Sequence, residues 1–202
     1  MKPDYSEYLK RDGMLDFIDE RWLASSWLHD GHAECVKRAM ARVSPASIVE
    51  FGCGTGLLAS RIDHGDYTMI DANRGCLDRA MGRNPGKRAM YCDLRALPDS
   101  LPTFDLGVCF GVLKHFGIEE WHGLLGILLS SCKWLVFDMP VDADQAEMLR
   151  DDGTEFPHVW ANPAQLIAWM EKRGLAVEID ESMADRTREF VFFVGPGAGS
   201  KL

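Results

Sequence analysis

Five short runs of apolar, β-prone residues alternate with helix-compatible segments through the middle of the chain. Each run ends close to a Gly, Asp or Pro, and the runs are ASIVEFG, DYTMIDA, KRAMYCDL, FDLGVCFG and KWLVFDMP. Strands that alternate with helices predict a parallel sheet with right-handed crossovers. The strands are apolar on both faces, which indicates that helices cover each side of the sheet. The pattern therefore limits the chain to the α/β class.

The last part of the sequence predicts a helix followed by an antiparallel pair of strands. Asn162 and Pro163 are typical of the cap and first turn of a helix, PAQLIAWMEKR, which Gly174 ends. The β-like runs LAVEID and REFVFFVG follow, and the link between them is too short for a crossover helix. We expect a seven-stranded, mostly parallel sheet that ends in an antiparallel hairpin strand.

Further helices are expected before and between the strands. Residues 5–42 have a helical pattern, with a break between two helices at Asp30-Gly31 and a stop at Ser44-Pro45. Between the strands, the segments LLASRI, RGCLDRAM and EEWHGLLGILLSSC are also compatible with helices.

Composition narrows the partners and the compartment. The 202 residues suggest one domain, and 22 Lys and Arg against 31 Asp and Glu give a net charge of -9, which disfavours nucleic acid. The six cysteines form no CxxC pair and are expected to be reduced thiols. No apolar stretch has the length of a membrane span, and no signal peptide is recognisable, so we expect a cytoplasmic protein.

The run SIVEFGCGTGLLASRI carries the strongest motif, with three glycines in five positions after a carboxylate. It lacks the Lys-Ser/Thr pair of a nucleotide-triphosphate P-loop. A dinucleotide fingerprint needs its third glycine one place later, where this chain has Leu57. Glu50 would repel a pyrophosphate at the same turn and attract an ammonium group. A ligand with a positively charged end therefore fits this turn better.

This turn, together with the order of the strands, resembles the class I S-adenosylmethionine-dependent methyltransferase family over residues 45–195. Its ExGxGxG pattern is formed by Glu50, Gly52, Gly54 and Gly56. The resemblance implies a Rossmann-like domain, preceded by a helical lid over residues 1–44 and followed by a flexible tail over residues 196–202. It also implies S-adenosylmethionine as cofactor, S-adenosylhomocysteine as product, and Glu50 near the cofactor's amino group.

The resemblance assigns further cofactor-binding residues at the ends of later strands. Asp71, with Ala72 beside it, is placed to accept two hydrogen bonds from the ribose diol, although a dinucleotide enzyme also has an acid at this position. Asp93 matches the residue that meets the adenine amino group, with Leu94 beside the ring, and its alternative role is a turn cap. The remaining expected contacts are Cys109, Phe110 and, as a small space-filler within the glycine turn, Cys53.

Candidate catalytic residues are less sharply defined. Methyl transfer requires the nucleophile to be held near the methyl carbon, and a base is needed only if the nucleophile arrives protonated. His115, at the start of the helix after the fourth strand, is the best candidate base, and its alternative role is packing. Asp138 and His158 are expected to face the acceptor, and either is equally well explained as a cap or a solvated loop residue.

The N-terminal segment contains two other patterns. Aromatic residues there would suit a sulfonium or a planar acceptor, although Trp at helical spacing is more often part of the core; they are Tyr5, Tyr8, Trp22 and Trp27. His29, His32 and Cys35 have the spacing of metal ligands on one helix face. The Asp30-Gly31 break and the lack of a fourth ligand argue against a metal, and none is expected.

We therefore expect a methyltransferase that acts on a small molecule, with the acceptor atom (O, N, S or C) and the oligomeric state left open. One alternative is a non-catalytic binding partner that retains the fold. The other is a nicotinamide-dependent oxidoreductase, which the glycine spacing and Glu50 disfavour.

Overall fold

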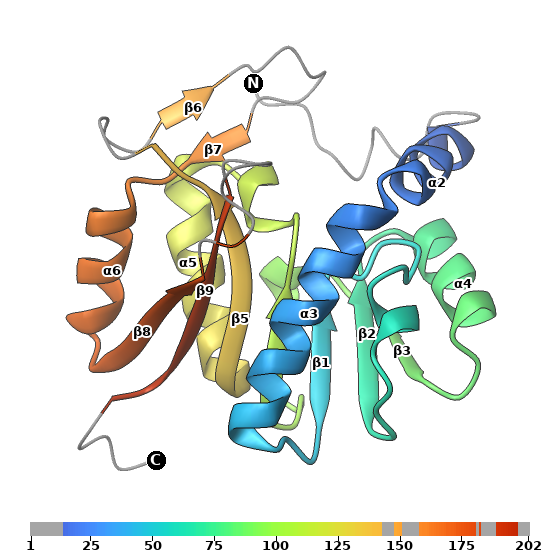
Figure 1. Cartoon of the computed structure of the whole chain (residues 1–202), viewed down its shortest axis with the longest axis horizontal. Coiled ribbons are helices and arrows are strands. Elements are labelled where there is room, and N and C mark those ends of the chain that lie inside the picture. Colours follow the sequence, from blue (N-terminus) through green and yellow to red (C-terminus); the bar gives the residue numbers. More distant parts are fainter. Residues whose placement is uncertain (1–13, 143–147, 151–157, 181, 183–188, 198–202) are drawn as a thin grey trace.

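The computed structural model describes residues 14–142, 148–150, 158–180, 182 and 189–197. Its main sheet has seven strands in the order β3-β2-β1-β4-β5-β9-β8 (Figure 1). The first five strands pair in parallel, and β9 is antiparallel to both β5 and β8. The strands are β1 (Ile48–Phe51), β2 (Tyr67–Asp71), β3 (Arg88–Tyr91), β4 (Phe104–Cys109), β5 (Cys132–Pro140), β8 (Leu175–Asp180) and β9 (Glu189–Pro196). The predicted fold class is confirmed.

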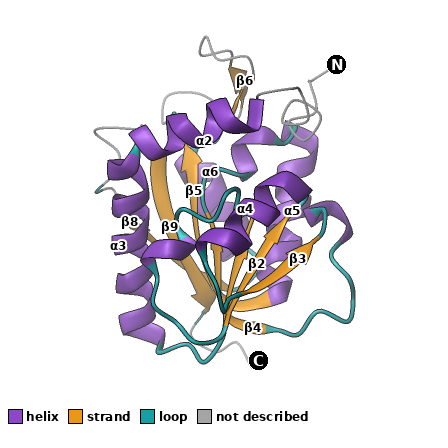
Figure 2. Ribbon diagram, turned by 90° about the vertical axis from the view of Figure 1, so that its right-hand side faces the viewer, coloured by secondary structure: helices purple, strands orange, loops and turns teal. Residues whose placement is uncertain are grey.

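Helices cover both faces of this sheet, as the apolar strands predicted. One buried cluster joins the sheet to α3 (Ser26–Val43) and α4 (Arg74–Arg83), through residues such as Val36 and Leu77. The other joins it to α5 (Ile118–Ser131) and α6 (Pro163–Glu171), through residues such as Leu125 and Leu166. Figure 2 shows α3 and α5 on opposite sides of the strands. All four residues of β1 are buried because both of its faces are covered.

Two helices begin with caps that fix their positions. Asn162 accepts a hydrogen bond from the Gln165 amide at 3.1 Å, Pro163 occupies the first turn of α6, and Gly174 follows with φ at +76°. Asn73 accepts the Cys76 amide at 2.9 Å at the start of α4. These side chains satisfy amide donors that the first helical turn leaves unpaired. The prediction that α6 starts at Pro163 is confirmed.

The N-terminal helices break at a different place from the one expected. The chain turns at Ser25, between α2 (Met14–Ala24) and α3, and α3 runs through Asp30 and Gly31 without interruption. Its buried face includes His32, Ala33 and Cys35. Packing of this face on the sheet outweighs the roughly 1 kcal/mol by which a helical glycine is less favourable than alanine. The predicted break at Asp30-Gly31 was therefore wrong.

The segment LLASRI forms one short 3₁₀ turn, η1 (Ala59–Arg61), where we expected a helix. The carbonyl of Leu57 accepts hydrogen bonds from the side chains of Ser60 and Arg61 at 2.7 Å each, which satisfy it without a helical partner. Residues 52–66 alone connect β1 to β2, and the glycine turn uses the first of them. This connection has no long helix, and α3 packs against it and against the same face of the sheet.

A small hairpin of β6 (Met148–Arg150) and β7 (His158–Trp160) was not predicted. Val159 and Ala161 of this region are buried in the cluster that contains α5 and α6. The predicted domain boundaries remain a prediction; residues 1–13 of the expected lid and 198–202 of the expected tail lie outside the described residues.

A matched pair of glycine substitutions tests the packing of the sheet. A Cβ atom at Gly195 would lie 1.9 Å from the Trp134 ring, whereas one at Gly126, within α5, would meet no atom within 4 Å. We expect Gly195→Ala to lower the free energy of unfolding by about 1–3 kcal/mol through overpacking. Gly126→Ala should raise it by up to about 1 kcal/mol. Urea denaturation measures both changes, and equal effects would contradict this packing of β9.

Candidate functional site

The glycine turn leaves the carboxyl end of β1 and is held against the end of β2. Gly52, Gly54 and Gly56 have φ angles of +73°, +53° and +75°, a region that glycine adopts without the steric cost of a side chain. The amides of Gly52 and Cys53 donate to the Ile70 carbonyl at 2.8 and 3.0 Å. The turn is therefore fixed by its neighbouring strand, at the edge where ligands bind to open α/β sheets.

Asp71, the last residue of β2, organises the same turn. One of its carboxylate oxygens accepts the Gly54 amide at 2.8 Å, and the other accepts the Asn73 amide at 2.7 Å. Burial raises the pKa of Asp71, and these two amides offset part of the rise. Each oxygen retains acceptor capacity beyond its amide, so the carboxylate has room for further donors. Ala72, half-buried, connects Asp71 to the cap of α4.

Glu50 lies beneath the turn, within β1. It is 4% exposed and accepts a hydrogen bond from the Tyr67 hydroxyl at 2.9 Å. Burial raises the pKa of Glu50 to about 8, despite that hydrogen bond. Cys53, next in the turn, is also buried, and burial raises its thiol pKa far above the usual value. A thiol held in this neutral form is a filler of space, as expected from the sequence, and not a nucleophile.

Further expected cofactor contacts lie after β3 and at the end of β4. Asp93 accepts the Arg95 amide at 2.9 Å and caps the 3₁₀ turn η2 (Leu94–Ala96), which is the simpler of the two roles considered for it. Leu94 is buried in the core. Cys109 ends β4 fully buried, and the Phe110 ring stacks on His32 at 4.2 Å between ring centroids.

Helix α2 lies over the glycine turn, and its Trp22 ring packs against Gly54. A Cβ atom at Gly54 would lie 2.9 Å from the Trp22 ring, so only glycine leaves room for this contact. On the other side, a Cβ atom at Gly52 would clash with Val112 at 2.5 Å. Of the other aromatic residues expected in a lid, Trp27 is 43% exposed, and Tyr5 and Tyr8 lie outside the described residues.

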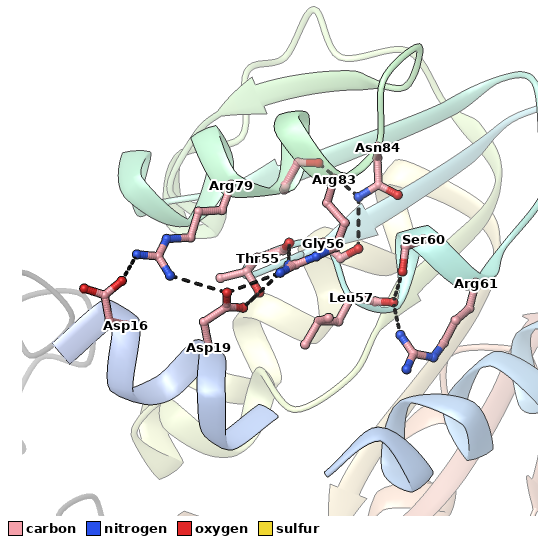
Figure 3. Close-up of polar contacts among 11 residues, drawn as sticks. Asp16, Asp19, Thr55, Gly56, Leu57, Ser60, Arg61, Arg79, Arg83 and Asn84 are labelled. Atoms are coloured by element: carbon pink, nitrogen blue, oxygen red, sulfur yellow. Dashed lines mark hydrogen bonds and ion pairs between the residues drawn. The ribbon is translucent and has the colours of Figure 1, made fainter. Parts of the chain in front are cut away.

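A cluster of charged side chains fastens α2 to the turn and to α4 (Figure 3). Asp19, 8% exposed, accepts a hydrogen bond from Thr55 and lies 3.3 Å from Arg79 and 3.2 Å from Arg83. Arg83 also donates to the Thr55 carbonyl, and Arg79 pairs with Asp16. Burial works to raise the pKa of Asp19, but the hydrogen bonds from Thr55 and Arg83 outweigh it and hold the pKa below its usual value.

A second polar cluster lies at the carboxyl end of β5. Asp138, His32 and Glu189 are all buried, and one ligand-type atom of each lies within 4.8 Å of the others. His32 Nε2 is 3.5 Å from Asp138 Oδ2. Lys114, in the 3₁₀ turn η3 (Leu113–His115), pairs with Glu189, and the Gly111 amide donates to Asp138 at 2.6 Å. Lys114 already supplies a cation to Glu189.

The expected catalytic residues are placed as follows. Asp138 belongs to the cluster just described, and His115 ends η3, half-buried, one residue after Lys114. His158 is the first residue of β7, and its side chain lies outside the described part of the structure. The histidine nearest to Asp138 among the described contacts is His32, which the sequence suggested only as part of a metal motif.

That metal motif does not converge in the structure. His32 faces Asp138, whereas Cys35 Sγ lies 3.1 Å from Arg38 and 3.8 Å from Asp180. Asp180 belongs to β8 and Asp138 to β5, so the two side chains approach different parts of the sheet. Sequence reasoning also missed Asp19, Arg79, Arg83, Lys114 and Glu189, because no local pattern connects residues so far apart.

The chain matches the family model described as a methyltransferase domain over residues 25–179, and it belongs to that family. No curated protein sequence matches it. None of the described helices has both the length and the apolar character needed to cross a membrane.

Solved structures share the fold at low sequence identity. Magnesium protoporphyrin IX methyltransferase from Synechocystis PCC 6803, with S-adenosylhomocysteine bound, has a TM-score of 0.68 at 13% identity, covering 95% of this chain and 100% of that one. An S-adenosylmethionine-dependent methyltransferase from Clostridium acetobutylicum ATCC 824 has a TM-score of 0.66 at 12% identity, covering 84% and 92%. The methyltransferase domain of bacterial CtHen1-C has a TM-score of 0.65 at 16% identity, covering 82% and 97%. The fold is that of class I S-adenosylmethionine-dependent methyltransferases.

Substitution of Asp19 tests the attachment of α2. Asp19→Asn keeps the shape of the side chain but removes the charge that Arg79 and Arg83 share. We expect it to cost about 1.5–3 kcal/mol, the range for hydrogen bonds to charged groups, and to speed amide hydrogen exchange in residues 14–24. Glu20→Gln, at an exposed position of the same helix, is the control. Unchanged exchange in Asp19→Asn would show that these contacts do not hold α2.

The pH dependence of stability tests the buried state of Glu50. Its pKa in the folded protein, about 8, lies above its ordinary value of 4.5, so the folded state binds the proton more tightly than the unfolded state. Wild-type stability should therefore fall, relative to Glu50→Gln, as pH rises from about 5 to about 8, by at most about 1.4 kcal/mol per pH unit. Thermal unfolding of both proteins across this range measures the difference. Parallel pH profiles would contradict the raised pKa.

Proposed function

We propose that the chain binds S-adenosylmethionine at the glycine turn and transfers its methyl group to a small-molecule acceptor, releasing S-adenosylhomocysteine. The observation that carries this proposal is the turn of Gly52, Gly54 and Gly56, whose positive φ angles and whose hydrogen bond to Asp71 place it at the carboxyl end of β2. Membership of the methyltransferase-domain family supports it. So does the S-adenosylhomocysteine bound in the structurally similar enzyme of Synechocystis PCC 6803.

The residues around the turn fit the charge and shape of this cofactor. Asp71, next to Ala72, retains acceptor capacity for the two ribose hydroxyls, which bind a carboxylate more strongly than a neutral acceptor. Glu50 is a buried carboxyl whose pKa an ammonium group would bring down again, so it suits the amino group of the cofactor. The glycines and Cys53 present backbone and small side chains at the turn.

Other residues would complete the cofactor site. We assign the adenine to Asp93 and Leu94, and the region of the methyl group to Cys109 and Phe110 at the end of β4. The Arg95 side chain lies 3.3 Å from the Asp93 carboxylate, so the adenine amino group would share that acceptor with the guanidinium. This makes Asp93 the weaker of the two acidic contacts.

The chemistry requires little of the protein beyond positioning. Bound S-adenosylmethionine supplies a methyl group on a sulfonium, which a nucleophile displaces in line. Of the residues expected near the acceptor, Asp138 lies in a buried polar cluster, and His115 and His158 remain candidates.

The net charge of -9 favours a small-molecule acceptor over nucleic acid, and we expect the protein to act in the cytoplasm.

Calorimetric titration with S-adenosylhomocysteine tests the cofactor and its carboxylate together. We expect Asp71→Asn to weaken binding about 10- to 100-fold, because charge-assisted hydrogen bonds contribute about 1.5–3 kcal/mol. Asp66→Asn, at an exposed carboxylate that pairs with Arg88 just before the same strand, is the control and should bind as the wild type does. NAD should not bind. Binding of NAD in preference to S-adenosylhomocysteine would favour a nicotinamide enzyme and overturn the proposal.

A further inference from the structure

The buried cluster at the end of β5 draws its members from four elements of the chain. His32 comes from α3, Asp138 from β5, Glu189 from the start of β9, and Lys114 from η3. His32, Asp138 and Glu189 are 4%, 2% and 6% exposed. Three ionisable groups this deeply buried are costly unless their charges are matched.

Two contacts within the cluster supply partners for its carboxylates. Lys114 pairs with Glu189, and the Gly111 amide bonds Asp138 Oδ1 at 2.6 Å. Asp138 Oδ2 and His32 Nε2 face each other at 3.5 Å, and neither has a hydrogen-bond partner among the described residues. With His32 neutral and Asp138 ionised, the four side chains of the cluster sum to one negative charge. One proton, or one positive charge beside the pair, would bring that sum to zero.

The cluster adjoins the end of β4, which we assign to the cofactor. Phe110 stacks on the His32 ring, and Gly111, the next residue, donates to Asp138. The same short segment therefore contacts both members of the unmatched pair. We propose that His32 and Asp138 together take up the proton that a hydroxyl or N–H acceptor loses when it is methylated. This inference rests on the proposed function.

The step balances in atoms and charge. The acceptor oxygen or nitrogen forms a bond to the methyl carbon as the carbon–sulfur bond breaks, and that electron pair stays on sulfur. The acceptor's proton passes to the pair, directly or through one water, and is held between His32 Nε2 and Asp138 Oδ2. Before transfer, the sulfonium charge offsets the Asp138 carboxylate; afterwards, the proton does. The net charge of the buried site therefore stays at zero throughout, which favours an acceptor that carries an exchangeable proton.

The titration behaviour of the pair agrees with this geometry. Burial raises the pKa of Asp138, although Lys114 and the Gly111 amide work against the rise, and burial lowers the pKa of His32 to about 4, so burial favours the uncharged form of both groups. The other groups that face the pair are Lys114, Glu189, the Cys109 thiol and His29, whose ring lies 6.4 Å from that of His32. A positively charged ligand should expel the proton, and a neutral one should not.

A divalent metal is the other occupant that these residue types suggest. Lys114 is already paired with Glu189, so two carboxylates and a divalent ion would leave the cluster with one net positive charge. Such a charge is as costly in a buried site as the negative one that it replaces. A proton leaves the cluster neutral, and it is the occupant that we assign.

Comparing S-adenosylmethionine with S-adenosylhomocysteine tests the pair without a known acceptor. We expect the ratio of their affinities, measured by calorimetry from about pH 6 to pH 8, to rise with pH by up to tenfold per unit, because only the sulfonium expels the proton. Asp138→Asn, which keeps an oxygen for Gly111, and His32→Gln should flatten this rise. His29→Gln, one helical turn away, should preserve it. Titration of the ligands' own amino groups is common to all four proteins and cancels in the comparison.

The outcomes separate this inference from the proposed function. If wild-type protein binds neither ligand, the proposed function fails. If it binds both with a ratio that is constant across pH, or if the rise persists in both folded variants, the proton-accepting pair is wrong. Micromolar binding of Mn²⁺ or Zn²⁺ to chelator-treated wild type, lost in His32→Gln, would also overturn it in favour of a metal site. Thermal unfolding confirms that each variant is folded before it is compared.

Discussion

The backbone of the glycine turn depends on acceptors at the end of the second strand. Gly52 and Cys53 donate to the Ile70 carbonyl, and Gly54 donates to the Asp71 carboxylate. These bonds fix a backbone with positive φ angles, in which amide groups and Cα hydrogens, not side chains, form the surface. The polar groups proposed to bind the cofactor are therefore the same groups that shape the turn, so binding and local structure are not separable at Asp71.

Side-chain contacts hold helix α2 against this same turn. Asp19 reaches Thr55 from one side, while Arg79 and Arg83 reach Asp19 from α4. Moving α2 away would leave a partly buried acid and two arginines without their counter-charges, a cost that rises with their burial. The Trp22 ring contacts Gly54 at the place where α2 crosses the turn. The Asp19 ion pairs, which belong to no local sequence motif, therefore hold α2 against the turn.

The features that could be predicted from the sequence have local causes. Alternating strands and helices gave the parallel sheet, and Asn162 with Pro163 placed the start of α6, because a cap acts on amides only three residues away. The uninterrupted α3 could not be predicted, since its stability comes from packing on the sheet. The cluster of His32, Lys114, Asp138 and Glu189 could not be predicted either: its residues come from four elements and meet only once the sheet has formed. The roles of Glu50 and Asp93 toward a ligand remain predictions.

The carboxyl edge of the sheet collects four acids whose charged forms are disfavoured by burial. Glu50 and Asp71 lie there on β1 and β2, Asp138 on β5 and Glu189 on β9, and burial raises the pKa of all four. A pyrophosphate brought to this edge would add negative charge beside acids whose charged forms burial already disfavours, whereas a ligand with ammonium and sulfonium groups would favour those charged forms. The shape of the sheet is shared with dinucleotide-binding proteins, so under the proposed function the discrimination between the two ligands would rest on these buried acids and not on the fold.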